Sequence, residues 1–222
     1  MKKMIGRTRI KICGMRERTE VAAVVAAGVD AIGLIFAGQS PRYIEPERAR
    51  EIVASLPPFV DAVGVFVDQP LDEVNEIARY CGLTMVQLHG SETPDYCAAI
   101  ACRVLKAFRV KDSLSTDDLA PYAGKVAAFL FDTFQEKLAG GTGQTFAWSL
   151  LKKLSPVSPV VLAGGLTPEN VGEAIRQARP FAVDLNSGVE FAPGRKDIDK
   201  VRAAIAQVAA VDAAVSRLSA DS

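Results

Sequence analysis

A cysteine closes a short apolar run near the start of the chain, the segment Arg9 to Gly14. If this run is extended, Lys11 and Cys13 lie on one face and Ile12 on the other, because strand side chains alternate. Gly14 then lets the chain turn away. The run therefore places a reactive thiol at a strand tip. Most cysteines of this kind only fill space, so a chemical role for Cys13 depends on what the rest of the chain places opposite it.

A second candidate is Asp132, which follows the apolar segment Phe129 to Phe131 with no basic residue beside it in the sequence. A carboxyl group in apolar surroundings has a raised pKa, which suits a general acid. The alternative is a solvated aspartate that caps a helix, since Thr133 and a glycine-rich loop come next.

Arg42 and His89 are candidates for ligand contacts. Arg42 follows Ser40-Pro41, and its planar guanidinium could bind a carboxylate, although it could equally be a surface arginine. His89 is the one histidine of the chain, which excludes a metal centre built from several histidines. His89 could bind a ligand, but we expect it to satisfy a neighbouring loop.

Glycine-rich segments follow two of the apolar runs. Gly164-Gly165 comes after one run, and Asp184 leads into Asn186-Ser187-Gly188 after the next. Backbone N–H groups free of side chains, with a hydroxyl beside them, bind phosphate well, although each pair alone could be an ordinary turn. A third glycine-rich segment, containing Gly141, Thr142 and Gly143, could add another wall and act as a lid.

The composition favours a small ligand. The 222 residues include 26 Lys and Arg against 26 Asp and Glu, so no overall charge attracts nucleic acid or a membrane. The four cysteines lack paired metal-ligand spacing, and we expect them to be free thiols. With no membrane span and no signal peptide in the sequence, the expected location is cytoplasmic.

Eight short runs rich in β-branched residues recur along the chain. They start about 20 to 33 residues apart, which leaves room for a crossover helix but is too long for a hairpin. The runs are 10–13, 31–36, 62–67, 85–88, 104–108, 127–131, 160–163 and 182–185.

Helix signals lie between these runs. Thr93-Pro94-Asp95 and Thr167-Pro168-Glu169 each predict an N-cap followed by a first helical proline, and Glu45-Pro46 begins a further helix. Ala27-Gly28 and Cys81-Gly82 are typical of helix ends. The segment from Asp197 to Ser222 predicts one alanine-rich helix.

Eight βα units in a row predict a single-domain (β/α)8 TIM barrel over residues 1–222, with 210–222 a frayed helical tail. A doubly wound open sheet is the alternative, but an open sheet of eight parallel strands would have two edge strands with unpaired backbone groups. In a barrel, function sits at the carboxyl ends of the strands. All the candidates above stand there.

Taken together, these residues resemble the phosphoribosylanthranilate isomerases of tryptophan biosynthesis, from about Thr8 to about Ala209. The segments that carry the resemblance are Lys11 to Gly14, Ser40 to Tyr43, Gln87 to Gly90, Lys106 to Arg109, Asp132, Gly140 to Gly143, Ala163 to Leu166 and Ser187 to Glu190. The sequence departs from the family pattern at Asn186, Gln144 and Ala147, where Ser, a basic residue and Asp are common.

The resemblance implies an Amadori rearrangement of N-(5'-phosphoribosyl)anthranilate without a cofactor or metal. Asp132 would be the general acid and Cys13 the general base, with no covalent intermediate. Arg42 would hold the anthranilate carboxylate, and the glycine clusters with Ser187 would bind the phosphate. Cys13 can act as a base only where its surroundings favour the thiolate, and Lys11 on the same strand face could help.

Two other functions remain open. One is another phosphate-binding barrel enzyme, such as an indole-3-glycerol-phosphate synthase or a sugar-phosphate epimerase, but one histidine cannot supply the epimerases' metal ligands. The synthase uses lysines at strand ends, whereas Lys11 and Lys106 lie within the expected strands. The other is a non-catalytic sensor of a phosphorylated metabolite, which would need the phosphate site but neither Cys13 nor Asp132. A monomer is expected, with a homodimer as the alternative.

Overall fold

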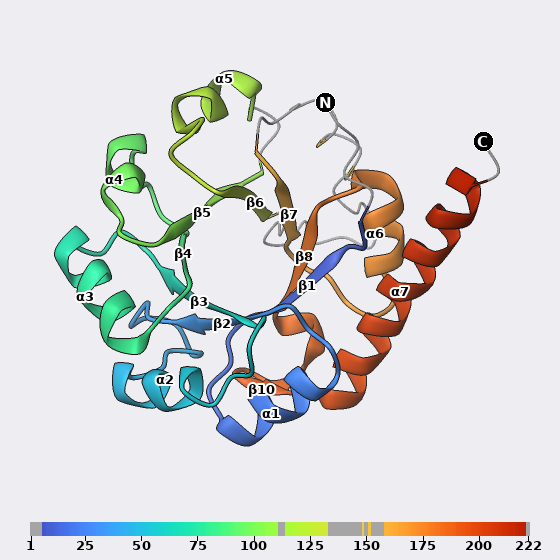
Figure 1. The fold of residues 1–222 in the computed structure, drawn as a ribbon, viewed down its shortest axis with the longest axis horizontal. Helices are drawn as coiled ribbons and strands as arrows, with labels where there is room; N and C mark the ends of the chain where they lie inside the picture. The colour runs from blue at the N-terminus through green and yellow to red at the C-terminus, as the bar shows by residue number, and fades with distance from the viewer. Residues whose placement is uncertain (1–5, 111–113, 133–147, 149–150, 152–157, 221–222) are drawn as a thin grey trace, which may run out of the picture.

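The computed structural model describes residues 6–110, 114–132, 148, 151 and 158–220. In this part of the chain, eight parallel strands close into a barrel in sequence order, and β8 pairs back onto β1 (Figure 1). The predicted (β/α)8 barrel is confirmed. Its strands are β1 Arg9–Ile12, β2 Ala31–Ile35, β3 Asp61–Phe66, β4 Met85–Leu88, β5 Arg103–Arg109, β6 Ala128–Asp132, β7 Val160–Ala163 and β8 Ala182–Leu185.

Helices surround the barrel on its outer side (Figure 1). They are α1 Arg18–Ala26, α2 Pro46–Val53, α3 Leu71–Cys81, α4 Pro94–Ala99, α5 Thr116–Leu119 continued by the 3₁₀ turn η1 Ala120–Tyr122, α6 Val171–Ala178 and α7 Ile198–Ala220. The helix α7 reaches Ala220 as predicted, and the fraying of residues 210–222 stays a prediction.

The alternation of strand side chains separates two cores. Alternate residues of β5 to β8, such as Ala107, Leu130 and Val161, form one buried cluster inside the barrel. Their neighbours, such as Phe129 and Leu162, belong to the larger cluster that includes the buried faces of the helices. Since the strands are buried on both faces, their sequences are almost continuously apolar.

Most helix boundaries follow the sequence signals. The side chain of Thr93 accepts a hydrogen bond from Tyr96 N at the start of α4 (3.2 Å), and α2 begins at Pro46. Gly82 ends α3 with a left-handed φ of 71°.

The prediction for Thr167-Pro168-Glu169 was wrong, because α6 begins later, at Val171. Asn170 explains the delay. Its Oδ1 accepts a hydrogen bond from Thr167 N and its Nδ2 donates to the carbonyl of Gly165. Residues 167–170 therefore form a turn that ties the helix start back to the end of β7.

A small hairpin after β8 was not predicted. The 3₁₀ turn η3 (Ser187–Val189) leads into β9 (Glu190–Ala192), which pairs antiparallel with β10 (Arg195–Lys196). The turn between them holds Gly194 at a φ of 74°. The sequence signal was Pro193-Gly194, a dipeptide typical of turns.

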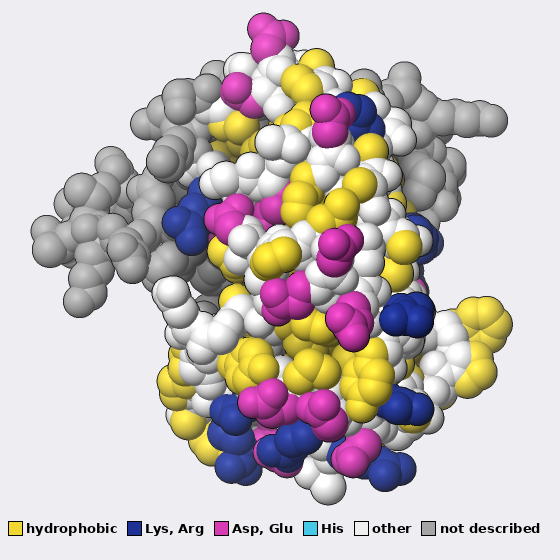
Figure 2. Space-filling model, turned by 90° about the vertical axis from the view of Figure 1, so that its left-hand side faces the viewer, with side chains coloured by type: hydrophobic (Ala, Val, Ile, Leu, Met, Phe, Trp, Pro, Cys, Tyr) yellow, Lys and Arg dark blue, Asp and Glu magenta, His cyan; other side chains and the backbone are white. Residues whose placement is uncertain are grey.

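The outer surface carries charges of both signs mixed with small apolar areas on the face shown in Figure 2. This matches the balanced composition of the chain. Among the described residues, no helix is both long and apolar enough to span a membrane.

Candidate active site

Cys13 lies directly after β1 and is 4% exposed. Its backbone N–H donates to the carbonyl of Leu185 (2.9 Å), which fixes it to the end of β8. A Cβ on Gly33 of β2 would lie 2.6 Å from Sγ, so the missing side chain of Gly33 makes the space for the thiol. Sequence reasoning missed Gly33, although a glycine inside an apolar strand often marks such a close approach.

A buried ammonium group lies beside this thiol. Lys11 Nζ is 2.7 Å from Asp184 Oδ2, and both side chains are 6% exposed. The charge of the same ammonium acts on Cys13, since it lowers the pKa of the thiol. Burial lowers the pKa of Lys11, but Asp184 and Cys13 oppose this and raise the pKa above its usual value. Lys11 therefore stays charged, and Asp184 contacts Lys11 within the barrel.

Burial raises the pKa of Cys13 above its usual value, whereas the charges of Lys11 and Lys196 act in the opposite direction. At neutral pH the free protein therefore carries Cys13 mainly as the thiol. The surroundings favour the thiolate only in part, and a base at this position becomes more active as the pH rises.

Asp132 ends β6, and the structure brings it to His89 at the end of β4. The distance from His89 Nε2 to Asp132 Oδ2 is 3.3 Å. Gln87 Nε2 donates to His89 Nδ1 (3.0 Å), which leaves the ring proton on Nε2, toward Asp132. The expectation that His89 satisfies a loop was therefore wrong. The surroundings of Asp132 are also less apolar than its sequence neighbours indicate.

Arg42 reaches the site from the loop after β2, and its Cδ lies 2.8 Å from where a Cβ on Gly14 would stand. Its guanidinium already binds a carboxylate, because Nε and Nη2 donate to Glu190 at 2.9 and 2.7 Å. Lys196 Nζ lies 2.7 Å from Glu190 Oε1, the oxygen that also accepts from Arg42 Nε. Sequence reasoning missed Glu190 and Lys196, since the hairpin that carries them was not predicted.

The loops after β7 and β8 touch each other, as one shared phosphate site requires. Gly164 and Gly165 have left-handed φ angles of 93° and 64°. A Cβ on Gly188 would clash with the carbonyl oxygen of Leu166, so only glycine allows this contact. Ser187 begins η3 in the loop after β8.

One residue of the expected phosphate site, Asn186, is hydrogen-bonded within the protein, and another segment of it lies outside the described residues. The Oδ1 atom of Asn186 accepts a hydrogen bond from Lys196 Nζ (3.0 Å), so its side chain is engaged by the hairpin. Gly141, Thr142 and Gly143 lie outside the described residues, as do Gln144 and Ala147.

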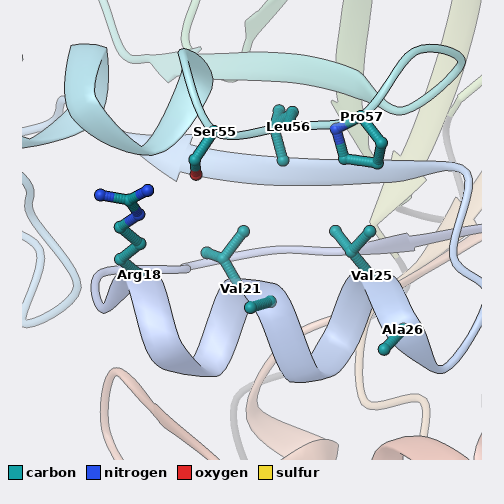
Figure 3. A pocket seen from close by; sticks show the side chains of 8 residues that line it. Arg18, Val21, Val25, Ala26, Ser55, Leu56 and Pro57 are labelled. Atoms are coloured by element: carbon teal, nitrogen blue, oxygen red, sulfur yellow. The ribbon is translucent and has the colours of Figure 1, made fainter.

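Among the described residues, no three His, Cys, Asp or Glu side chains could hold one metal ion together. A groove of about 310 Å³ lies elsewhere, between Val21 and Val25 of α1 and Leu56 and Pro57 after α2 (Figure 3). No strand-end candidate lines this groove.

A model of the N-(5'-phosphoribosyl)anthranilate (PRA) isomerase family matches residues 10–207. The chain belongs to this family. The N-(5'-phosphoribosyl)anthranilate isomerase of Geobacter metallireducens is 50% identical over 194 residues, which is 87% of this chain and 95% of the relative. The isomerase structure from Thermus thermophilus superposes with a TM-score of 0.82 at 38% identity, covering 92% of this chain and all of that one.

A second isomerase structure holds a ligand. It contains reduced 1-(o-carboxyphenylamino)-1-deoxyribulose 5-phosphate and is 38% identical with a TM-score of 0.78, covering 91% of this chain and 99% of that one. The alternatives of an indole-3-glycerol-phosphate synthase and a sugar-phosphate epimerase are therefore excluded.

Proposed function

We propose that the chain isomerises N-(5'-phosphoribosyl)anthranilate in tryptophan biosynthesis with Asp132 as the general acid and Cys13 as the general base. The reaction is the one that gives the family its name. The observation that supports these two roles is that both groups end strands of one barrel, each beside a partner. Lys11 lies next to Cys13, and His89 Nε2 lies 3.3 Å from Asp132.

The first step opens the ribose ring. Asp132 donates a proton to the ring oxygen, and the C1'–O bond breaks with its electron pair on that oxygen. The lone pair of the anthranilate nitrogen then forms a protonated Schiff base with C1'. A positioned carboxylic acid supplies this proton without a metal ion.

The second step moves a proton from C2'. Cys13 as the thiolate takes this proton, the C–H electron pair forms the C1'=C2' bond, and the C=N pair returns to nitrogen. The resulting enolamine tautomerises to the ketone when the C2' hydroxyl loses its proton and C1' gains one. Proton exchange with water restores both groups, so the net change is an isomerisation.

The other site residues bind the two charged ends of the substrate. Arg42 would bind the anthranilate carboxylate. The loops with Gly164, Gly165 and Gly188 would bind the phosphate, with Ser187 and Asn186 beside them and Gly141, Thr142 and Gly143 as a further wall. Binding energy from these remote groups helps to hold the reacting carbons between Asp132 and Cys13.

The test is the loss of anthranilate-type fluorescence when purified protein, treated with a chelator and given no metal, meets the substrate. Turnover is the expected result. Binding of a substrate analogue without any turnover would instead favour the sensor function. We also expect a cytoplasmic monomer, and sedimentation velocity at several concentrations would distinguish it from a homodimer.

A further inference from the structure

The contact between Arg42 and Glu190 uses only one edge of the guanidinium. Nε donates to Oε1 at 2.9 Å and Nη2 donates to Oε2 at 2.7 Å. Within the described residues, these are the groups through which the Arg42 side chain hydrogen-bonds. A guanidinium carries a second fork, formed by Nη1 and the remaining N–H of Nη2, which fits another carboxylate.

Glu190 is itself held in place. Its Oε1 accepts hydrogen bonds from Lys196 Nζ (2.7 Å) and from Gly194 N (3.1 Å), and its side chain is 5% exposed. Burial by itself raises the pKa of Glu190, but the hydrogen bonds from Arg42 and Lys196 lower it below its usual value. Glu190 therefore remains a fixed anion at neutral pH.

The position of Arg42 places this arrangement next to the candidate base. The Arg42 Cδ packs over Gly14, the residue after Cys13, where a φ of 76° and the lack of a side chain both require glycine. The Arg42 side chain is 19% exposed, in contrast to the buried Glu190 and Lys196. The guanidinium is thus the part of this ion network that a ligand can reach.

We propose that Glu190 is a positioning residue that fixes Arg42 by its Nε–Nη2 edge and leaves the Nη1–Nη2 fork for the ring carboxylate of the substrate. Lys196 supports this role, because its ammonium balances the charge of Glu190 at Oε1, the oxygen that also accepts from Arg42 Nε. The inference rests on the proposed role of Arg42 in carboxylate binding. It makes Glu190 a determinant of specificity for anthranilate over an amine without a carboxylate.

Two other roles for Glu190 give different results. If it only stabilises the hairpin, its loss weakens every ligand equally. If it competes with the substrate for Arg42, its loss makes carboxylate ligands bind more tightly. Two ligands that differ only in the carboxylate therefore separate the three roles.

The experiment measures dissociation constants by calorimetry for reduced 1-(o-carboxyphenylamino)-1-deoxyribulose 5-phosphate and for the same compound without the ring carboxylate. Glu190→Gln should weaken binding of the first about tenfold and change that of the second less than about twofold. Equal weakening of both, or tighter binding of the first, would overturn the proposal. Arg42→Met tests the underlying function separately, because unchanged preference for the carboxylate there would contradict the role of Arg42 itself.

Two further variants control for the loss of a buried charge pair and for a general effect on the hairpin. Glu190→Gln leaves Lys196 buried without its anion, so the double variant Glu190→Gln with Lys196→Met removes both charges and should show the same selective loss. If the double variant keeps the wild-type preference for the carboxylate ligand, the proposal is wrong. Glu20→Gln is the matched control, since Glu20 pairs with Arg195 of the same hairpin, and it should change neither constant.

Discussion

Lys11 and Asp184 are cross-strand neighbours in the register that joins β1 to β8, and Nζ meets Oδ2 there at 2.7 Å. The seam that closes the barrel is thus also the place where a buried ammonium group lies beside Cys13. One residue pair contributes to the closed sheet and to the electrostatics of the candidate base. This coupling makes the ionisation of Cys13 sensitive to both partners.

Opposite shifts in the Cys13 pKa are expected from the two partners. Lys11→Met removes a positive charge that lowers this pKa, so the thiolate should form at higher pH than in the wild type. Asp184→Asn removes a negative charge that raises it, so the thiolate should form at lower pH. The measurement is the rate of iodoacetamide alkylation of Cys13 against pH, followed by peptide mapping. Shifts in the same direction would contradict the account.

Gly33→Ala should displace the thiol of Cys13, because the added Cβ would lie 2.6 Å from Sγ. We expect kcat to fall by about 10²-fold and the free energy of unfolding to fall by roughly 1 to 3 kcal/mol. Steady-state kinetics and urea denaturation measure the two effects. Gly38→Ala is the control, since a Cβ there meets nothing within 4 Å. A wild-type kcat in Gly33→Ala would show that the position of the thiol is unimportant.

His89 should act on Asp132 through the N–H group at Nε2. His89→Leu removes the donor that lies 3.3 Å from Asp132, and kcat should fall roughly tenfold or more. His89→Gln can still offer an N–H at similar reach, so it should retain more activity than the leucine variant. Equal kcat values in the two variants would argue against a role for the donor. Circular dichroism checks that both variants fold.

The buried pair of Lys106 and Glu92 should matter for stability. Lys106 Nζ lies 2.8 Å from Glu92 Oε2 and also donates to the carbonyl of Gly90 (2.8 Å). Lys106→Met leaves Glu92 charged and buried, so unfolding in urea should show a loss of about 3 to 5 kcal/mol. Adding Glu92→Gln should recover part of it. A double variant no more stable than Lys106→Met would show that the unpaired charge of Glu92 is not the cause of the loss. Lys125→Met removes one partner of an exposed pair, and as the control it should change the free energy of unfolding little.

The sequence was sufficient for the barrel and for the two proposed proton-transfer groups. Eight apolar runs at crossover spacing leave few other folds, and strand ends lie at one mouth whatever the details of packing. Cys13 and Asp132 could therefore be chosen from their places at the ends of runs, before their neighbours were known.

The partners of these groups depend on register and on loop conformation, which the sequence pattern does not specify. The contact of His89 with Asp132 joins β4 to β6, across the strand between them. The contact of Arg42 with Glu190 joins residues 148 positions apart through a hairpin only two to three residues long on each side. The one local signal for that hairpin was its Pro-Gly turn.

The central claim is that Cys13 and Asp132 transfer the two protons, and kcat of Cys13→Ala and Asp132→Asn tests it most directly. Each variant should lose about 10² to 10⁴-fold in kcat while it still binds reduced 1-(o-carboxyphenylamino)-1-deoxyribulose 5-phosphate, because neither residue is proposed to hold the carboxylate or the phosphate. Unchanged turnover in both variants would contradict the mechanism.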